Sequence, residues 1–386
     1  MSVWKECTIA DLGTVVGGAT PSTKDSANYD NGTIAWLTPK DLSGYQGRYV
    51  SRGERNITEK GLRSCSTQLL PKHSVLFSSR APIGYIAIAE NEICTNQGFK
   101  SVIPNERTDY LFLYYLLRYK KDTIESMGTG TTFKEVSGNT MRGIQVKVPS
   151  DISEQRRIAS ILGSIDDKIE ANTAINNNLE QQAKALYNQM FLANASDNWT
   201  HGVLSDIADI TMGQSPSGDS YNEDGEGTIF YQGRAEFGSR FPTQRLCTTQ
   251  PKRMARENDV LMSVRAPVGD LNVAREDCCI GRGLASIRSK DNHQSFILYT
   301  MFALQLELDK FNGEGTVFGS INRDSLNKMP IIIPSIDIME QFESIVAPMD
   351  AQIRNNHEEN LRLEAIRDAL LSKLMSGELD VSEVDI

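Results

Sequence analysis

The chain has 386 residues, of which 39% are hydrophobic and 23% are charged. At about 150 residues per domain, this length allows two or three domains that each bury a core. The longest apolar run, Leu111 to Leu117, is far shorter than the roughly 20 residues that span a membrane. The first residues also lack an apolar signal-peptide core, so we expect a cytoplasmic protein with no membrane contact.

The net charge of −10 is distributed unevenly. Residues 1–150 carry +4, residues 151–197 carry −3, residues 198–335 carry −3 and residues 336–386 carry −8. Because salt screens charges beyond about 10 Å, DNA responds to the local field and not to the total charge. The acidic total therefore does not exclude a nucleic-acid partner.

Local patterns predict a β-rich first part, a long helix, a second part and another long helix. In chain order, short β-like runs occupy 33–37, 74–78 and 143–148, and helices occupy 109–119, 154–191, 294–306 and 338–375. Asp151-x-x-Glu154 and Asp337-x-x-Glu340 have the spacing of helix-capping pairs ahead of the two long helices.

The sequence contains an internal repeat of about 190 residues. Arg80-Ala81-Pro82-Ile83-Gly84 recurs as Arg265-Ala266-Pro267-Val268-Gly269, an offset of 185 positions, and Pro21-Ser22 recurs as Pro216-Ser217 at an offset of 195. About ten residues between these blocks are therefore missing from the second copy. The matches keep the same order in both copies, which indicates one unit used twice.

Each long helix carries an apolar seam with alternating steps of four and three. The first runs from Ile158 to Met190 and the second from Phe342 to Leu374, with one departure at Arg367. The pattern predicts an antiparallel coiled coil between the helices, whose register is set by Asn172, Asn176, Asn356 and Asn360. The alternative is that each helix packs on its own globular part, with the Asn side chains at a wet rim.

These features define four segments and a mixed α/β fold. We predict recognition regions at 1–150 (region 1) and 198–335 (region 2), separated by spacer helices at 151–197 and 336–386 that form the coiled coil, with a pseudo-twofold relating the copies. Two similar modules at the ends of a rigid spacer are suited to contact duplex DNA at two places one helical turn apart. A two-headed protein adaptor without DNA affinity would have the same organisation.

The whole chain resembles the specificity subunits of type I restriction-modification systems. The resemblance rests on Gly17-Gly18-Ala19-Thr20-Pro21-Ser22 with Gly213-Gln214-Ser215-Pro216-Ser217, on both Arg-Ala-Pro-(Ile/Val)-Gly turns, and on the Pro-led entries to the helices. It implies that each region recognises one half of a split, asymmetric DNA target. It also implies two modification subunits that use S-adenosylmethionine to methylate adenine, and two restriction subunits that use ATP and Mg²⁺. The recognition subunit of a related two-subunit restriction enzyme is a further alternative.

We expect no catalytic residue, metal or cofactor in this chain itself. Its six Cys form no Cys-x-x-Cys pair, and its four His are isolated. The sequence has no Gly-x-x-x-x-Gly-Lys-(Ser/Thr) loop and no Asn-Pro-Pro-Tyr or Asp-Pro-Pro-Tyr methyltransferase motif.

DNA binding requires cations for phosphates and Arg, Lys, Asn or Gln for base edges. The richest basic stretches lie at comparable places in the two copies, yet their sequences differ, as two halves of an asymmetric target require. The predicted contacts from these stretches are Arg48, Arg52, Arg55 and Arg63 in region 1, and Arg240, Arg245, Lys252 and Arg253 in region 2. The alternative is that these basic stretches are ordinary solvent-exposed surface without a role in DNA contact.

Four further candidates come from aligned positions of the repeat. Arg80 and Arg265 are the same in both copies, so they serve either a phosphate contact or a hydrogen bond that holds the turn. Gln97 aligns with Arg282, and this difference is the kind expected of a base-reading position.

Overall fold

A computed structural model describes residues 3–130, 134–313 and 319–381. The chain forms two compact units, one of Met1–Ala171 with Glu359–Ile386 and one of Asn172–Glu358. Each unit thus contains one predicted recognition region together with a part of both long helices. No helix within the described residues is long and apolar enough to cross a membrane.

The first unit contains a five-stranded sheet, a three-stranded sheet and a two-stranded ribbon, which connects to the long helix α6. The sheet orders are β2-β9-β6-β7-β4, β5-β3-β8 and β1-β10. The strands are β1 (Trp4–Thr8), β2 (Gly13–Gly17), β3 (Ile34–Leu37), β4 (Tyr49–Val50), β5 (Arg55–Ile57), β6 (Val75–Ser79), β7 (Ile83–Ala89), β8 (Cys94–Thr95), β9 (Lys100–Pro104) and β10 (Gln145–Pro149). The helices are α1 (Ile9–Leu12), α2 (Glu59–Arg63), α3 (Tyr110–Tyr119), α4 (Lys121–Ser126), α5 (Gly138–Gly143) and α6 (Ile152–Tyr187), with α6 continuing into the second unit.

The second unit contains sheets of order β12-β20-β17-β18 and β13-β15-β14-β19-β16 and the ribbon β11-β21. Its strands are β11 (Thr200–Val203), β12 (Ala208–Met212), β13 (Tyr221–Asn222), β14 (Thr228–Tyr231), β15 (Leu246–Thr248), β16 (Met254–Ala255), β17 (Val260–Ser263), β18 (Leu271–Val273), β19 (Cys278–Ile280), β20 (Leu284–Ser289) and β21 (Pro330–Ile333). Its helices are α7 (Leu204–Ile207), α8 (Gln294–Ala303), α9 (Gln305–Asp309), α10 (Arg323–Asn327) and α11 (Ile336–Ser376), with α11 continuing into the first unit.

The repeat seen in the sequence is also a repeat of topology. The order β2-β9-β6-β7 in the first unit corresponds to β12-β20-β17-β18 in the second, and β5-β3-β8 corresponds to β15-β14-β19. Among these corresponding strands the pairings are antiparallel, except that β3 with β8 and β14 with β19 are parallel. The additional strand β4 of the first unit also pairs with β7 in parallel. The predicted mixed α/β architecture with two β-rich regions and two long helices is confirmed.

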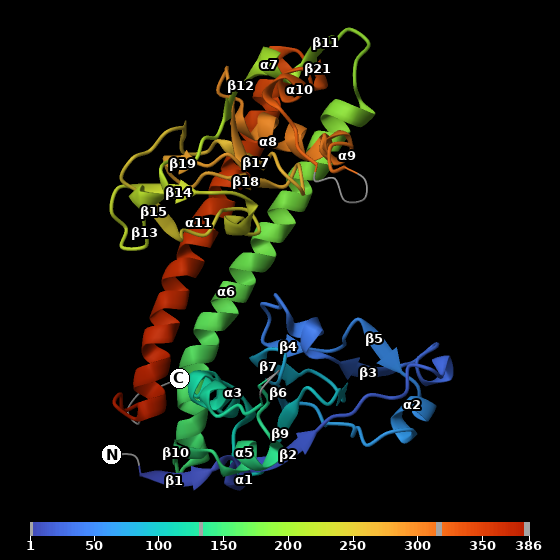
Figure 1. The fold of residues 1–386 in the computed structure, drawn as a ribbon, viewed down its shortest axis with the longest axis vertical. Coiled ribbons are helices and arrows are strands. Elements are labelled where there is room, and N and C mark those ends of the chain that lie inside the picture. The colour runs from blue at the N-terminus through green and yellow to red at the C-terminus, as the bar shows by residue number, and fades with distance from the viewer. Residues whose placement is uncertain (1–2, 131–133, 314–318, 382–386) are drawn as a thin grey trace. The chain divides into compact units, whose positions relative to one another are not determined.

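In each unit, a segment of α6 lies beside a segment of α11, and the two run in opposite directions (Figure 1). In the first unit, Arg367 Nη1 is 2.8 Å from Asp166 Oδ1, and the amide of Asn360 lies 3.4 Å from the carbonyl oxygen of Ile169. In the second unit, the Asn356 amide donates to Asn176 Oδ1 at 2.8 Å, and the Asn176 amide donates to the carbonyl oxygen of Ile353 at 3.1 Å. Residue numbers that rise on one helix fall on its neighbour, so the predicted antiparallel coiled coil is confirmed.

The helices share their cores with the regions on which they pack. In the second unit, Tyr187 at the end of α6 and Phe191 in the π-helical turn that follows it (Asn188–Ala193) contact Phe296 of α8 and Phe342 of α11 at ring-centroid distances of 4.9 to 5.8 Å. Aromatic contacts of this kind contribute about 0.5–1.5 kcal/mol each beyond burial. In the first unit, α3 packs with Ile158 and Leu162 of α6 and Leu374 of α11 in one cluster.

Three predicted boundaries need correction. The predicted helix at 294–306 breaks at Leu304, where α8 ends and α9 begins. The predicted strand at 143–148 starts at Gln145, because Gly143 is the last residue of α5. Asp337 is not a cap residue: α11 already begins at Ile336, and Ser335 is the residue whose carbonyl accepts from the Ile338 and Met339 amides.

Candidate nucleic-acid interface

The predicted basic stretch of region 1 contributes exposed cations from β5, α2 and the loop before them. Arg52, Arg55 and Arg63 are all exposed. The Arg55 guanidinium lies 4.2 Å above the ring of Tyr29, and Arg63 lies 3.8 Å from Glu59 one turn away on α2. An exposed pair at that distance contributes little, so these guanidinium groups can be drawn to a phosphate at small cost.

The corresponding stretch of region 2 flanks β15: Arg245 directly precedes this strand, and Lys252 and Arg253 lie between it and β16. Arg245, Lys252 and Arg253 are exposed. Arg245 Nη2 pairs with the buried Glu236 at 2.9 Å, whereas Lys252 and Arg253 have no ion-pair partner among the described residues. The Arg253 carbonyl accepts from the Ile280 amide at 2.9 Å, which fixes the backbone from which this cation projects.

Arg48 and Arg240 are not on this surface, and their predicted role in DNA contact is corrected. They are only 4% and 7% exposed. Arg48 pairs with Asp167 and Glu170 of α6, and Arg240 pairs with Glu180 of α6 and Asp350 of α11. Each guanidinium is buried and already paired with acids of the long helices, so it is not available to a phosphate or a base edge.

The repeated arginines follow the equivalent strands β6 and β17 but have different surroundings. Arg80 Nη1 lies 3.4 Å from Glu135, which also holds Lys100 at 3.1 Å. Arg265 is exposed, and in its β-bridge the residue opposite is Ser320, where region 1 has Glu135. In region 1, Glu135 is the partner for the hydrogen bond predicted for Arg80. Contact with a phosphate stays a prediction for both Arg80 and Arg265.

Gln97 and Arg282 lie in equivalent loops, before β9 and β20. Both are exposed. The Thr20 hydroxyl donates to Gln97 Oε1, and the Arg282 amide donates to Ser215 Oγ at 3.3 Å. Because Thr20 and Ser215 are also equivalent in the repeat, the two loops share a scaffold and present different side chains. That arrangement suits positions that discriminate bases.

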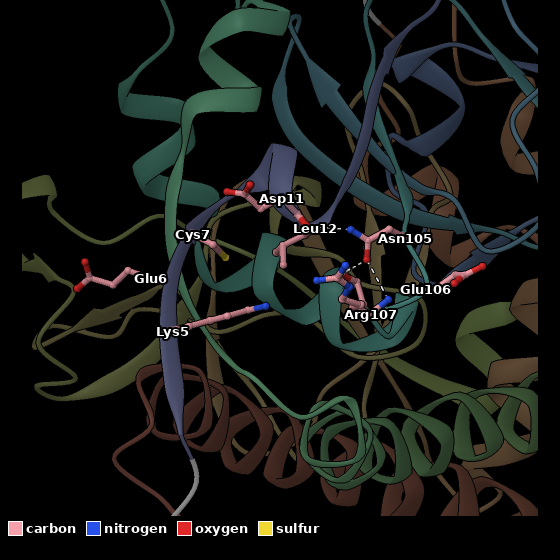
Figure 2. A pocket seen from close by; sticks show the side chains of 9 residues that line it. Lys5, Glu6, Cys7, Asp11, Leu12, Asn105, Glu106 and Arg107 are labelled. Atoms are coloured by element: carbon pink, nitrogen blue, oxygen red, sulfur yellow. Dashed lines mark hydrogen bonds between the residues drawn. The ribbon is translucent and has the colours of Figure 1, made fainter.

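One polar hollow was not foreseen from the sequence. It lies where β1 and α1 meet the loop after β9, and Figure 2 shows Lys5, Asp11, Asn105 and Arg107 around it. The side-chain amide of Asn105 donates to the backbone carbonyl of Asp11 at 2.8 Å, and Asn105 Oδ1 accepts from the backbone amide of Arg107 at 3.0 Å. The first bond ties the loop to α1 and the second closes the turn within the loop, so both have a structural role at the edge of the hollow.

Nothing in this hollow resembles a catalytic centre. Burial raises the pKa of the Cys7 thiol, which is the opposite of what a reactive thiolate requires. The backbone hydrogen bond from Thr8 lowers the pKa of Asp11, so this carboxylate serves as a local cap. Within the described residues, no cluster of His, Cys, Asp and Glu has the geometry of a metal site.

The repeated fold with differing basic loops is that of a two-module DNA-recognition protein. A model of the type I restriction modification DNA specificity domain matches residues 1–181 and again residues 196–365. The chain therefore belongs to this family of DNA specificity subunits, and the match favours DNA recognition over the adaptor alternative.

Known relatives agree with this family along the whole chain. The type I restriction enzyme MjaIX specificity subunit of Methanocaldococcus jannaschii is 33% identical over 410 residues, covering 99% of this chain and 94% of that protein. The HindI specificity subunit of Haemophilus influenzae is 22% identical, covering 98% and 100%. A crystal structure of the type I restriction-modification S subunit from M. genitalium has the same fold, with a TM-score of 0.63 at 16% identity over 97% of this chain and 96% of that one.

Proposed function

We propose that this chain recognises a bipartite, asymmetric DNA target, with one half-site bound by each recognition region. The observation that carries the proposal is one fold present twice with different exposed cations on equivalent loops. A common scaffold with different contact residues is what two unlike half-sites require. The number of unread base pairs between the half-sites follows from the length of the helix pair.

In this proposal the chain supplies recognition, and partner subunits supply the chemistry. Two modification subunits bind S-adenosylmethionine and methylate adenine, and two restriction subunits use ATP and Mg²⁺. The whole assembly works on DNA in the cytoplasm. The acidic helices are the docking surface that the charge distribution favours for the modification subunits.

Methylation mapping in cells with and without this chain tests the proposal. We expect one split adenine-methylated sequence that is present only with the chain. The charge reversal Arg245→Glu with Arg253→Glu should weaken the contribution of only one half-site to recognition, because both residues lie in region 2. A methylated sequence that is continuous, or unchanged when the chain is deleted, would refute the bipartite model.

Salt dependence separates this function from that of a protein adaptor. Phosphate contacts release counterions, so the affinity of the assembled complex for its target should fall steeply as salt rises. Each of the substitutions Lys252→Ala and Arg253→Ala should reduce the slope of log K against log salt by about one if that side chain contacts a phosphate. The absence of any salt-dependent affinity for DNA would favour the adaptor.

A further inference from the structure

Arg48 and Arg240 occupy equivalent places in the two copies, although the sequence repeat does not align them. The Arg48 carbonyl accepts from the amide of Ile88 in β7 at 2.8 Å, and the Arg240 carbonyl accepts from the amide of Val273 in β18 at 2.9 Å. Strands β7 and β18 have the same place in the two sheet orders. Both arginines therefore leave the same side of the same fold.

Both arginines reach from the recognition region to the long helices. Arg48 Nε and Nη2 lie 3.0 and 3.2 Å from the two oxygens of Glu170, and Nη1 lies 3.4 Å from the carbonyl oxygen of Gly163. In the second unit, Arg240 Nη1 lies 3.2 Å from Glu180 of α6, and Nη2 lies 2.5 Å from Asp350 of α11. The two-pronged contact with Glu170 fixes direction as well as distance, because a planar guanidinium fits a carboxylate in one plane.

A tyrosine completes each contact on the helix side. Tyr115 of α3 donates to Asp166 of α6 at 2.6 Å, and Tyr299 of α8 donates to Asp350 of α11 at 3.0 Å. Tyr115 and Tyr299 are 184 positions apart, as are Asp166 and Asp350. The region-to-helix junction is thus built twice from the same elements, with an arginine beside a tyrosine–aspartate pair.

We infer that Arg48 and Arg240 are positioning residues that fix the orientation of each recognition region on its own helix segments. This inference rests on the proposed bipartite function: if the helices set the gap between half-sites, a region that can tilt on its helix accepts more than one gap. Neither side chain touches DNA. Their loss should therefore relax the choice of gap and leave the base preference of each half-site unchanged.

The test uses the assembled methyltransferase complex and a plasmid library with the two half-sites separated by every gap within three base pairs of the natural one. The wild-type complex should methylate one gap. In Arg48→Met and Arg240→Met, the ratio of methylation at the natural gap to that at neighbouring gaps should fall by roughly tenfold or more, since a displacement of 1 Å can cost about 100-fold in rate. Arg48→Lys keeps the charge without the two-pronged geometry and should be intermediate. The exposed Arg142 and Arg323, substituted by Met, are matched controls that should leave the gap profile unchanged.

An unchanged gap profile in Arg48→Met and Arg240→Met would overturn the inference. If Arg48→Met fails to fold, Arg48→Lys decides: an equal loss at every gap in a variant with native thermal unfolding would mean a merely structural role and would also overturn it. A wild-type complex that itself accepts all gaps would instead refute the proposed bipartite function.

Discussion

Removing the carboxylate of Asp166 should destabilise the first unit by about 3 kcal/mol, since loss of one partner from a buried ion pair costs about 3–5 kcal/mol. Asp166 is 4% exposed, yet it accepts from the Tyr115 hydroxyl at 2.6 Å and pairs with Arg367 Nη1 at 2.8 Å. In Asp166→Ala, the Tyr115 hydroxyl and the Arg367 guanidinium would stay largely buried without this acceptor. We take the lower end of the range because Arg367 keeps a second acid, Asp368, at 2.9 Å.

Asp368 provides the matched control, because it pairs with the same arginine from an exposed position. Its side chain is 61% exposed, and exposed ion pairs contribute about 0–1 kcal/mol. Urea unfolding, with hydrogen exchange of the α3 amides to identify the first unit, should give a loss below about 1 kcal/mol for Asp368→Ala. Equal losses for the two variants, or a loss below 1 kcal/mol in Asp166→Ala, would refute the reasoning from burial.

Two other predictions concern the second unit. Burial, helped by the nearby charge of Arg275, lowers the pKa of His357. The unfolded state therefore binds the proton more readily, and the free energy of unfolding should fall as pH drops below about 6.5. In urea unfolding from pH 5 to 8, the free energy of unfolding should depend less on pH in His357→Phe than in the wild type, and an identical pH dependence would contradict this. Asn356→Leu alone should cost about 1–3 kcal/mol, because it leaves Asn176 Oδ1 without its donor, although the Asn176 amide still donates to the Ile353 carbonyl. The double variant with Asn176→Leu should recover that loss, as a double-mutant cycle would show, and additive losses would count against a coupled pair.

The long helices were predictable because their signal is repetitive. Ten seam positions at heptad spacing in each helix all indicate a coiled coil. The single departure, Arg367, pairs with the acid Asp166 on the facing helix. Helix ends depend on one or two residues and are less certain. Ser335 and Asp337 are both good capping types, and only the packing of the first turn of α11 decides between them.

The candidate site was predictable as a set of loops but not residue by residue. Arg48 and Arg240 belong to basic stretches, and composition alone cannot distinguish a guanidinium that faces solvent from one that meets an acid of a distant helix. A usable signal was present in the acids Asp167 and Glu170, which lie outside the apolar seam of α6. They indicate a charged partner, although the partner itself depends on how β4 and β7 approach the helix.

The junction acids are not fully repeated, and this asymmetry predicts which recognition region can replace the other. Shifted by 184 positions, Asp166 and Glu180 have the acidic counterparts Asp350 and Glu364. Region 2 placed on the first unit's helix segments would thus find an acid at both positions that correspond to the partners of Arg240. Shifted in the same way, Asp167 and Glu170 become Ala351 and Arg354.

Region 1 placed on the second unit's helix segments would therefore bring Arg48 against Arg354 and a neutral alanine. We expect a chain with two copies of region 2 to fold and to methylate a symmetric target, whereas a chain with two copies of region 1 should unfold at lower urea concentration. Ala351→Asp with Arg354→Glu should restore the second chain, because these changes rebuild both partners of Arg48. Equal stability of the two chains before that repair would show that the arginine contacts do not control how a region is seated on its helices.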